Sequence, residues 1–221
     1  MLVKMGRAGS IKSVAKIPRE SRQCPLIVEL SDVPARLDLA RLFDNHLPVE
    51  LEIGTGKGSF LLNRSASRPE VNFIGLEWAQ SYCLYSADRF QRAGISNVRM
   101  LRAEAGWVFR NALAPGSIQR IHIYFPDPWP KRRHHHRRLI EPGFVQSAIK
   151  ALAPGGQLLI VTDHMEYFVQ IKRVLISQPG LARCIRQDSA SLQKEQVGTN
   201  FERKYMAQGR PIYMLTMLRY A

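Results

Sequence analysis

A chain of 221 residues is long enough for one substantial hydrophobic core, and a hydrophobic content of 45% excludes a disordered protein. The 32 Lys and Arg residues against 18 Asp and Glu give a net charge of +14, which favours nucleic acid as the partner. No apolar run approaches the ~20 residues that span a bilayer, and the N-terminus lacks the apolar core of a signal peptide. The three cysteines are far apart without a Cys-x-x-Cys pair, so we expect neither disulfides nor zinc, but a reducing cytoplasm.

The N-terminal stretch is basic and shows no strong periodicity. Residues 1–22 contain six Lys and Arg residues against a single acid, Glu20. Such a segment is typical of an arm that an anionic partner orders. We therefore expect residues 1–48 to form a basic arm and lead-in, and residues 49–221 to form one domain.

From residue 49 onward, strand patterns alternate with helix patterns. The expected strands are 49–53, 72–77, 98–101, 120–125 and 157–161, with two more β-like runs near 184–186 and 212–218. The expected helices are 59–67, 79–93, 106–113, 142–152 and 165–177. This alternation predicts an α/β fold with a mainly parallel sheet. Ligands of such sheets bind beyond the carboxyl ends of the strands, so the strand ends are the places to search.

The first strand ends in a glycine-rich loop preceded by an acid. Gly54, Gly56 and Gly58 alternate along the loop, which lets the backbone turn tightly and approach a ligand closely. Ser59 stands where a dinucleotide fingerprint has its third glycine. Glu52 adds a carboxylate that suits a cofactor with a cationic amino group better than a pyrophosphate. A glycine turn of any α/β protein is the alternative interpretation.

Two further acids follow the second and third strands. Glu77 lies 23 positions after Gly54, the spacing of an acid that accepts hydrogen bonds from a ribose diol. Its alternative is a solvated glutamate at a strand end. Glu104 is placed to accept from an adenine amino group, and equally to stabilise the N-terminus of a helix.

The fourth strand runs into a segment with three prolines in five residues, 126–130. Phe125, Asp127 and Trp129 each precede a proline, which predicts extended backbone at all three. The result is a stiff platform that carries one carboxylate and one indole where the sheet should bind its ligands. A rigid proline turn with an incidental aspartate is the alternative.

A cationic run follows at 131–138, with five Lys and Arg residues and three histidines. Adjacent histidines rarely converge on one ion, so phosphate contacts are favoured over a solvated face and over a metal site. Asp163 ends the fifth strand. The segment 199–202 fits a helix capping box, with Gly209 ending that helix, or a functional segment.

These motifs together carry a resemblance. Residues 52–58, with an acid after the second strand, resemble the opening of class I methyltransferases that bind S-adenosylmethionine (SAM). Residues 125–131 with the following basic run, Thr162-Asp163 and Thr199-x-Phe201-Glu202 resemble the bacterial tRNA (guanine-N7-)-methyltransferase family. The resemblance runs from about residue 49 to the end. It implies a Rossmann-like fold with a mainly parallel seven-stranded sheet and helices on both faces.

The resemblance also implies an activity, which is methyl transfer from SAM to N7 of the guanine at position 46 in the tRNA variable loop, without a metal. The residues that it implies for SAM binding are Glu52, Gly54, Gly56, Gly58, Glu77, Glu104 and Asp127. Those that it implies for tRNA binding are Lys131, Asp163, Thr199, Asn200, Phe201 and Glu202. It implies no membrane and no obligatory protein partner, and monomer and homodimer both stay open.

Guanine N7 carries a lone pair and no proton, so its methylation needs no general base and depends on placement and charge. The product guanine is cationic, so Asp127 is the candidate catalytic residue, facing the developing charge or the N1/N2 edge of the base. Asp163 and Glu202 are further candidates for that edge.

Four other functions stay open at this point. They are methylation of another RNA guanine, a non-catalytic RNA-binding protein with this fold, a nicotinamide-dependent oxidoreductase, and methylation of small molecules or proteins. The missing third glycine and Glu52 disfavour the oxidoreductase. Methylation of small molecules or proteins would leave the positive charge unexplained.

Overall fold

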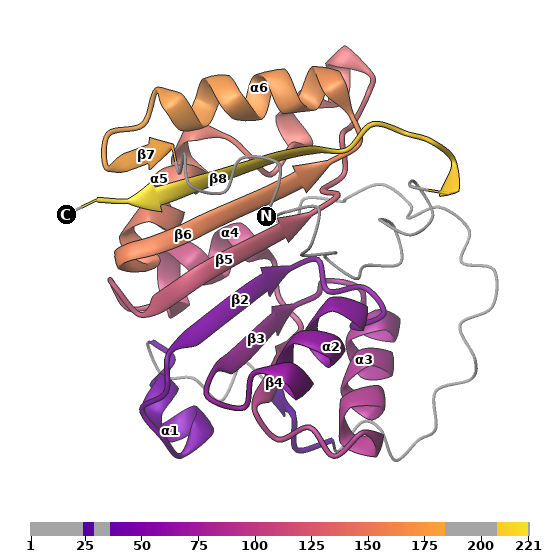
Figure 1. The fold of residues 1–221 in the computed structure, drawn as a ribbon, viewed down its shortest axis with the longest axis vertical. Coiled ribbons are helices and arrows are strands. Elements are labelled where there is room, and N and C mark those ends of the chain that lie inside the picture. Colours follow the sequence, from indigo (N-terminus) through magenta and orange to yellow (C-terminus); the bar gives the residue numbers. More distant parts are fainter. Residues whose placement is uncertain (1–23, 29–35, 184–206, 221) are drawn as a thin grey trace, which may run out of the picture.

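The computed structural model describes residues 24–28, 36–183 and 207–220. Within them, eight strands form one sheet in the order β1-β4-β3-β2-β5-β6-β8-β7. The strands are β1 (Ile27–Val28), β2 (Val49–Ile53), β3 (Asn72–Leu76), β4 (Val98–Leu101), β5 (Ile118–Tyr124), β6 (Leu152–Thr162), β7 (Leu181–Arg183) and β8 (Tyr213–Arg219). Strands β1 to β6 all pair in parallel with one another, whereas β8 runs antiparallel to both β6 and β7. Figure 1 shows β8 pointing opposite to β2, β5 and β6.

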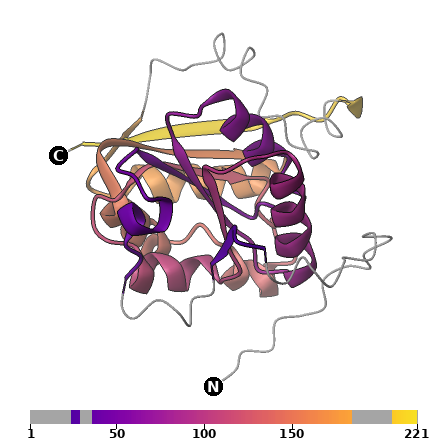
Figure 2. The same ribbon diagram turned by 90° about the horizontal axis from the view of Figure 1, so that it is seen from below.

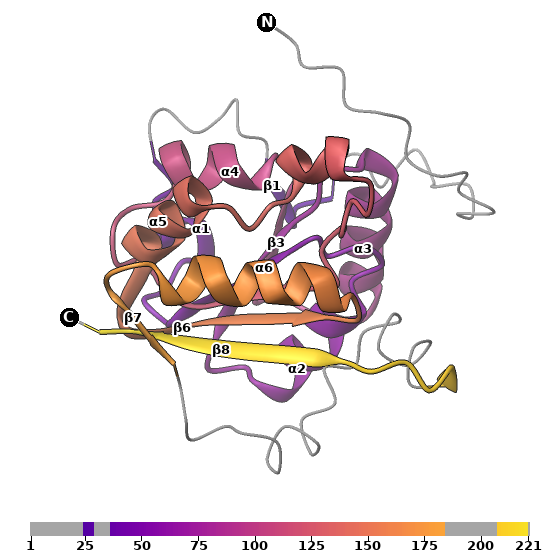
Figure 3. The ribbon, with the colours of Figure 1, turned by 90° about the horizontal axis from the view of Figure 1, so that it is seen from above.

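Helices cover both faces of the sheet. They are α1 (Leu39–Phe43), α2 (Ser59–Ser67), α3 (Gln80–Arg92), α4 (Ala105–Trp107), α5 (Pro142–Ala151) and α6 (Met165–Ile176). Two buried clusters fill the spaces, one with side chains of α4, α5 and α6, the other with side chains of α2 and α3. Figures 2 and 3 accordingly place α2 and α4 on opposite sides of the sheet.

Local sequence explains where several helices begin and end. Helix α2 follows the glycine loop and keeps the predicted bounds, and α5 begins at Pro142, whose fixed φ and missing N–H suit a first turn. Side chains of α5 at Phe144, Val145, Ala148 and Ala151 are buried, the spacing of one helical face. The predicted alternation of strands and helices on a mainly parallel sheet is therefore confirmed.

The structure corrects three details of the prediction. The sheet has an eighth strand, β1, whose two residues pair with Met100 and Leu101 and are too short to show periodicity. The expected helix 106–113 is one α turn followed by a π-helical turn, Val108–Ala112. Strand β6 begins at Leu152, directly where α5 ends, and not at residue 157.

The lead-in before residue 49 contributes to the packing of the sheet. Cys24, Leu26, Leu37 and Phe43 are buried, each at most 7% exposed. Helix α1 is capped by Asp38, whose carboxylate accepts a hydrogen bond from the Arg41 N–H. Residues 1–23, which include the expected arm, lie outside the described residues.

Candidate functional site

Five strand-end acids come together at one edge of the sheet. Glu52 lies on β2, and Glu77, Glu104, Asp127 and Asp163 follow β3, β4, β5 and β6. These five strands are adjacent and parallel, so their carboxyl ends share one edge. Figure 1 shows the arrowheads of β2, β5 and β6 pointing to that edge. The structure thus groups the acids that the sequence pattern singled out.

The glycine loop is held in left-handed backbone. Gly54, Gly56 and Gly58 have φ angles of 78°, 54° and 71°, which side chains rarely adopt. At Gly54 an added Cβ would meet nothing within 4 Å, so the loop is open there. At Gly58 an added Cβ would lie 2.6 Å from the Phe90 ring, so this glycine is required for packing α2 against α3.

We expect Gly58→Ala to lower the free energy of unfolding more than Gly94→Ala. Both positions have positive φ, which costs about 1–2 kcal/mol for alanine. Gly94 has open space around it, whereas the overlap of Gly58 with buried Phe90 adds roughly 1–3 kcal/mol. Urea unfolding of both variants measures the difference, and equal losses would contradict this packing role of Gly58.

Glu52 is a buried carboxyl group with unused hydrogen-bonding capacity. It is 3% exposed, and its Oε2 has no hydrogen-bond partner among the described residues. Burial raises the pKa of Glu52 well above its usual value, and the charge of Glu77 raises it further. An ammonium group would supply both the missing donors and the compensating charge. The site therefore fits the amino group of a SAM-like cofactor.

Glu77 links the glycine loop to the start of α3. Its Oε2 accepts a hydrogen bond from the Gly56 N–H at 2.8 Å, and its Oε1 accepts one from the Ala79 N–H at 2.8 Å. Each carboxylate oxygen keeps a further lone pair, so a ribose hydroxyl can still donate to it.

Glu104 stabilises the N-terminus of a helix, which was the second role expected for it from the sequence. Its two carboxylate oxygens accept hydrogen bonds from the N–H groups of Gly106 and Trp107, both at 2.7 Å, and so cap α4. Arg110 lies 3.9 Å from Glu104 Oε2. A contact of Glu104 with adenine remains a prediction.

The proline segment leaves β5 in an unexpected conformation. Phe125 and Trp129 have φ angles of 50° and 43°, so the prediction of extended backbone is wrong for both. A following proline disfavours the right-handed helical region, but left-handed backbone also avoids that region. Positive φ costs a non-glycine residue free energy and occurs often at functional sites. The turn leaves Asp127 exposed at the sheet edge.

The cationic run folds into a 3₁₀ turn, Arg132–Arg137, that divides its side chains into two sets. Arg137 lies 5.0 Å from the centre of the Trp129 ring, and His134 meets that ring edge-on at 5.9 Å between centroids. The other set is exposed and consists of Lys131, Arg132, Arg133 and His136. These four exposed side chains are placed to contact phosphates.

Arg138 was predicted with the phosphate-binding run, but it points inward and is 4% exposed. Its Nε donates to the Pro128 carbonyl at 2.8 Å, and its Nη2 donates to Glu166 Oε1 at 3.1 Å. Charge alone could not distinguish this arginine from its neighbours. The only signal in the sequence is its place beside the apolar pair Leu139-Ile140.

Asp163 forms an ion pair with Arg210 at 3.0 Å and is only partly exposed. The remaining predicted substrate residues, Thr199, Asn200, Phe201 and Glu202, lie outside the described residues. Their role therefore stays a prediction.

A buried polar network that the sequence analysis missed lies on the face of the sheet that carries α2. The ring of His122 is hydrogen-bonded through Nε2 to Glu50 Oε2 and through Nδ1 to the Tyr124 hydroxyl, both at 2.8 Å. Arg68 donates to the other Glu50 oxygen at 2.6 Å. Polar residues at alternate positions of two otherwise apolar strands were the signal that could have revealed it.

The charges of this network follow from burial and partners. Burial lowers the pKa of His122, while its hydrogen bond to Glu50 opposes that shift, so we assign a neutral ring. Burial alone would raise the pKa of Glu50, but the hydrogen bond from His122 and the nearby cations Arg120 and Arg64 outweigh it and lower the pKa to about 2. An ionised Glu50 then accepts from His122 Nε2–H, and the Tyr124 hydroxyl donates to His122 Nδ1.

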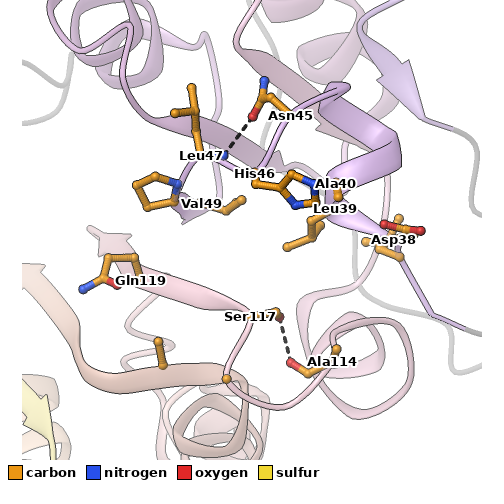
Figure 4. A pocket seen from close by; sticks show the side chains of 14 residues that line it. Asp38, Leu39, Ala40, Asn45, His46, Leu47, Val49, Ala114, Ser117 and Gln119 are labelled. Carbon is orange, nitrogen blue, oxygen red and sulfur yellow. Dashed lines mark hydrogen bonds between the residues drawn. The ribbon is translucent and has the colours of Figure 1, made fainter.

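A shallow pocket of about 480 Å³ lies at the opposite edge of the sheet. Its lining includes Asp38, His46, Val49, Ser117 and Gln119, near the amino ends of β2 and β5 (Figure 4). It is therefore separate from the strand-end acids.

In the described ranges, no three His, Cys, Asp or Glu side chains are grouped to hold a metal ion. None of the helices described is long and apolar enough to cross a membrane.

Comparison with known proteins assigns residues 46–215 to a family described as "Putative methyltransferase". A tRNA (guanine-N(7)-)-methyltransferase of Bordetella pertussis is 38% identical over 84% of this chain and 73% of that protein. The protein of the same name from Myxococcus xanthus is 35% identical over 78% of this chain and 84% of that protein.

Two solved structures show the same fold at low sequence identity. The 16S rRNA methyltransferase KamB superposes with a TM-score of 0.63 at 15% identity, covering 84% of this chain and 95% of that chain. A SAM-dependent methyltransferase from Aquifex aeolicus gives 0.54 at 13% identity, covering 78% and 82%. The predicted Rossmann-like methyltransferase fold is thereby confirmed.

Proposed function

Because this chain belongs to the tRNA (guanine-N7-)-methyltransferase family, we propose that it transfers a methyl group from SAM to N7 of a guanine in tRNA. The observation that carries the proposal is the set of acids at the sheet edge, in a chain whose relatives of that name match it over most of its length. We further propose the variable-loop guanine, position 46, as the target. We also propose that the protein acts in the reducing cytoplasm and that tRNA is its partner.

The residues that would hold SAM are the strand-end acids and the glycine loop. Glu52 would accept from the amino group, Glu77 from the ribose, and Glu104 from the adenine. The open backbone at Gly54 and Gly56 leaves room for the cofactor to approach. When bound, SAM supplies an electrophilic methyl group on a sulfonium centre.

The chain's own part in the reaction is placement and charge. Guanine N7 needs no deprotonation, so the site needs no general base. Asp127, on its proline-stiffened turn, would stabilise the positive charge that develops on the guanine, or hold the N1/N2 edge of the base. Holding the reactants in line can contribute roughly 7–11 kcal/mol to lowering the barrier.

The substrate would be bound by the exposed cations beside Asp127. Lys131 directly follows the proline segment, and Arg132 and Arg133 continue the same exposed set. Asp163 and the segment 199–202 would contact the base and its neighbours. A non-catalytic RNA-binding role would leave Glu52 Oε2, which has no hydrogen-bond partner among the described residues, without a ligand.

We expect Lys131→Ala to weaken tRNA binding and to reduce its salt dependence. Loss of one phosphate contact should lower the slope of log Kd against log salt by about 0.7–0.9. Filter binding over a salt series measures the slope. Lys150→Ala is the matched control, because Lys150 is exposed at the end of α5, at the opposite edge of the sheet. An unchanged slope for Lys131→Ala would mean that Lys131 contacts no phosphate.

The function itself is tested by incubating the protein with methyl-labelled SAM and a tRNA transcript. Borohydride reduction and aniline cleavage then locate N7-methylguanine in the strand. We expect cleavage at the variable-loop guanine, and a transcript with that guanine replaced should not be labelled. Label at another guanine would keep the activity but change the target, whereas no label would favour the RNA-binding alternative.

A further inference from the structure

Arg138 is a buried cation that directly follows the basic turn Arg132–Arg137. Its side chain is 2% exposed, and all three guanidinium nitrogens are used. Nε donates to the Pro128 carbonyl, Nη1 to Gln170 Oε1 and Nη2 to Glu166 Oε1. The guanidinium also lies over the Tyr167 ring, 4.9 Å from its centre.

These partners belong to two separate parts of the chain. Pro128 lies between Asp127 and Trp129, in the middle of the proline segment. Gln170, Glu166 and Tyr167 lie on α6, which follows the strand end that carries Asp163. Arg138 therefore connects the turn of Asp127 to the helix beside Asp163.

The proline segment has few backbone N–H groups through which it can be held. Prolines have no N–H to donate, and three of the five residues at 126–130 are prolines. Positive φ occurs at Phe125, just before the segment, and at Trp129 within it, a conformation that persists only when the surroundings hold it. The Pro128 carbonyl is the acceptor through which Arg138 can hold the segment's centre.

Neighbouring contacts fix Arg138 itself to α6. The Ile140 N–H donates to the Tyr167 hydroxyl at 3.1 Å, and Gln170 Nε2 donates to the Ile140 carbonyl at 3.4 Å. A planar guanidinium can reach three acceptors in a fixed fork, which a lysine ammonium cannot reproduce. The position thus requires arginine for its geometry and not only for its charge.

We propose that Arg138 is a positioning residue that holds the Asp127 turn against α6 and does not contact tRNA phosphate. The inference rests on the proposed function, in which Asp127 faces the reacting guanine. A shift of about 1 Å in such a group can cost about 10²-fold in rate, so loss of the connection should act on the rate of transfer and not on binding.

The test compares Arg138→Lys and Arg138→Met with Arg173→Met, which removes an exposed arginine from the same helix, α6. For both Arg138 variants we expect the single-turnover rate at saturating tRNA to fall about 10²-fold, with tRNA Kd and its salt slope close to wild type. A third variant, Arg138→Ala, leaves a space for a small cation. Added methylguanidinium should restore part of its transfer rate, and equal concentrations of urea should not. Arg173→Met should behave as wild type.

A second measurement does not depend on activity. Hydrogen exchange of the peptide covering residues 125–131 should accelerate in Arg138→Met and not in Arg173→Met. If the Arg138 variants are too unstable to purify, Gln170→Ala and Glu166→Gln weaken the same connection from the helix side. They should produce the same change in exchange, to a smaller degree.

The outcomes separate the two proposals. A weaker tRNA Kd and a lower salt slope at an unchanged saturating rate would make Arg138 a phosphate contact and overturn the positioning role. Unchanged rates and unchanged exchange would also overturn it. Absence of methyl transfer by the wild-type protein would instead overturn the proposed function, while the exchange measurement would still decide whether Arg138 holds the turn.

Discussion

Replacing Asp127 by alanine should reduce the rate of methyl transfer about 10²–10³-fold, the range found when one preorganised charge-stabilising group is removed. The carboxylate is exposed on a stiff turn at the sheet edge, so its loss should not affect folding. The negative charge of Asp127 stabilises the positive charge that forms on guanine in the transition state. The substitution should therefore lower the saturating transfer rate more than it lowers the affinity for SAM. Single-turnover assays with calorimetric SAM titration measure both.

Asp127→Asn distinguishes the two roles that remain open for this carboxylate. The amide keeps a hydrogen-bond acceptor for the guanine edge but removes the charge, so a loss close to that of alanine indicates electrostatic stabilisation. Near-normal turnover of Asp127→Ala would remove this residue from the centre of the mechanism. Asp88→Ala, which deletes a partly exposed acid paired with Arg92 on α3, is the control for a general effect of charge.

The strand-end acids could be found from the sequence because their placement depends on local patterns. Helix 59–67 and strands 49–53 and 98–101 have the predicted bounds, since caps, glycines and apolar periodicity act within a few residues. Once these elements alternate, topology brings Glu52, Glu77 and Asp127 to one edge. The fold and the acidic part of the site could therefore be predicted from interactions between residues that are close in the sequence.

The direction of a side chain within the basic run could not be found in this way. Arg133 and Arg138 have the same charge and similar neighbours, yet one is exposed and the other is buried. The difference arises from the 3₁₀ turn and from acceptors on α6, about 30 residues further along the chain. The pairing of Glu50 with His122 likewise depends on β2 and β5 lying side by side, 72 residues apart.

That pairing has a consequence for stability in acid. In the folded protein Glu50 stays ionised until the pH falls to its pKa of about 2, whereas in the unfolded chain it takes up a proton near pH 4.5. A lowered carboxyl pKa stabilises the fold above the unfolded value, and this stabilisation is lost as the pH falls from about 4.5 to about 2. At 1.36 kcal/mol per pKa unit, the shift corresponds to roughly 3 kcal/mol near neutral pH.

We therefore expect Glu50→Gln to lower the free energy of unfolding by roughly 3 kcal/mol at pH 7, and the deficit to shrink as the pH falls below 4.5. The amide is isosteric, so the space beside His122 stays filled while the anion facing Arg68 is removed. Urea unfolding followed by circular dichroism at several pH values measures both effects. Glu70→Gln is the matched control: Glu70 also pairs with Arg68, at 2.9 Å, but is exposed, so its loss should change little. A deficit that stays constant through the acid range would show that Glu50 stabilises the fold by hydrogen bonding alone and not by its charge.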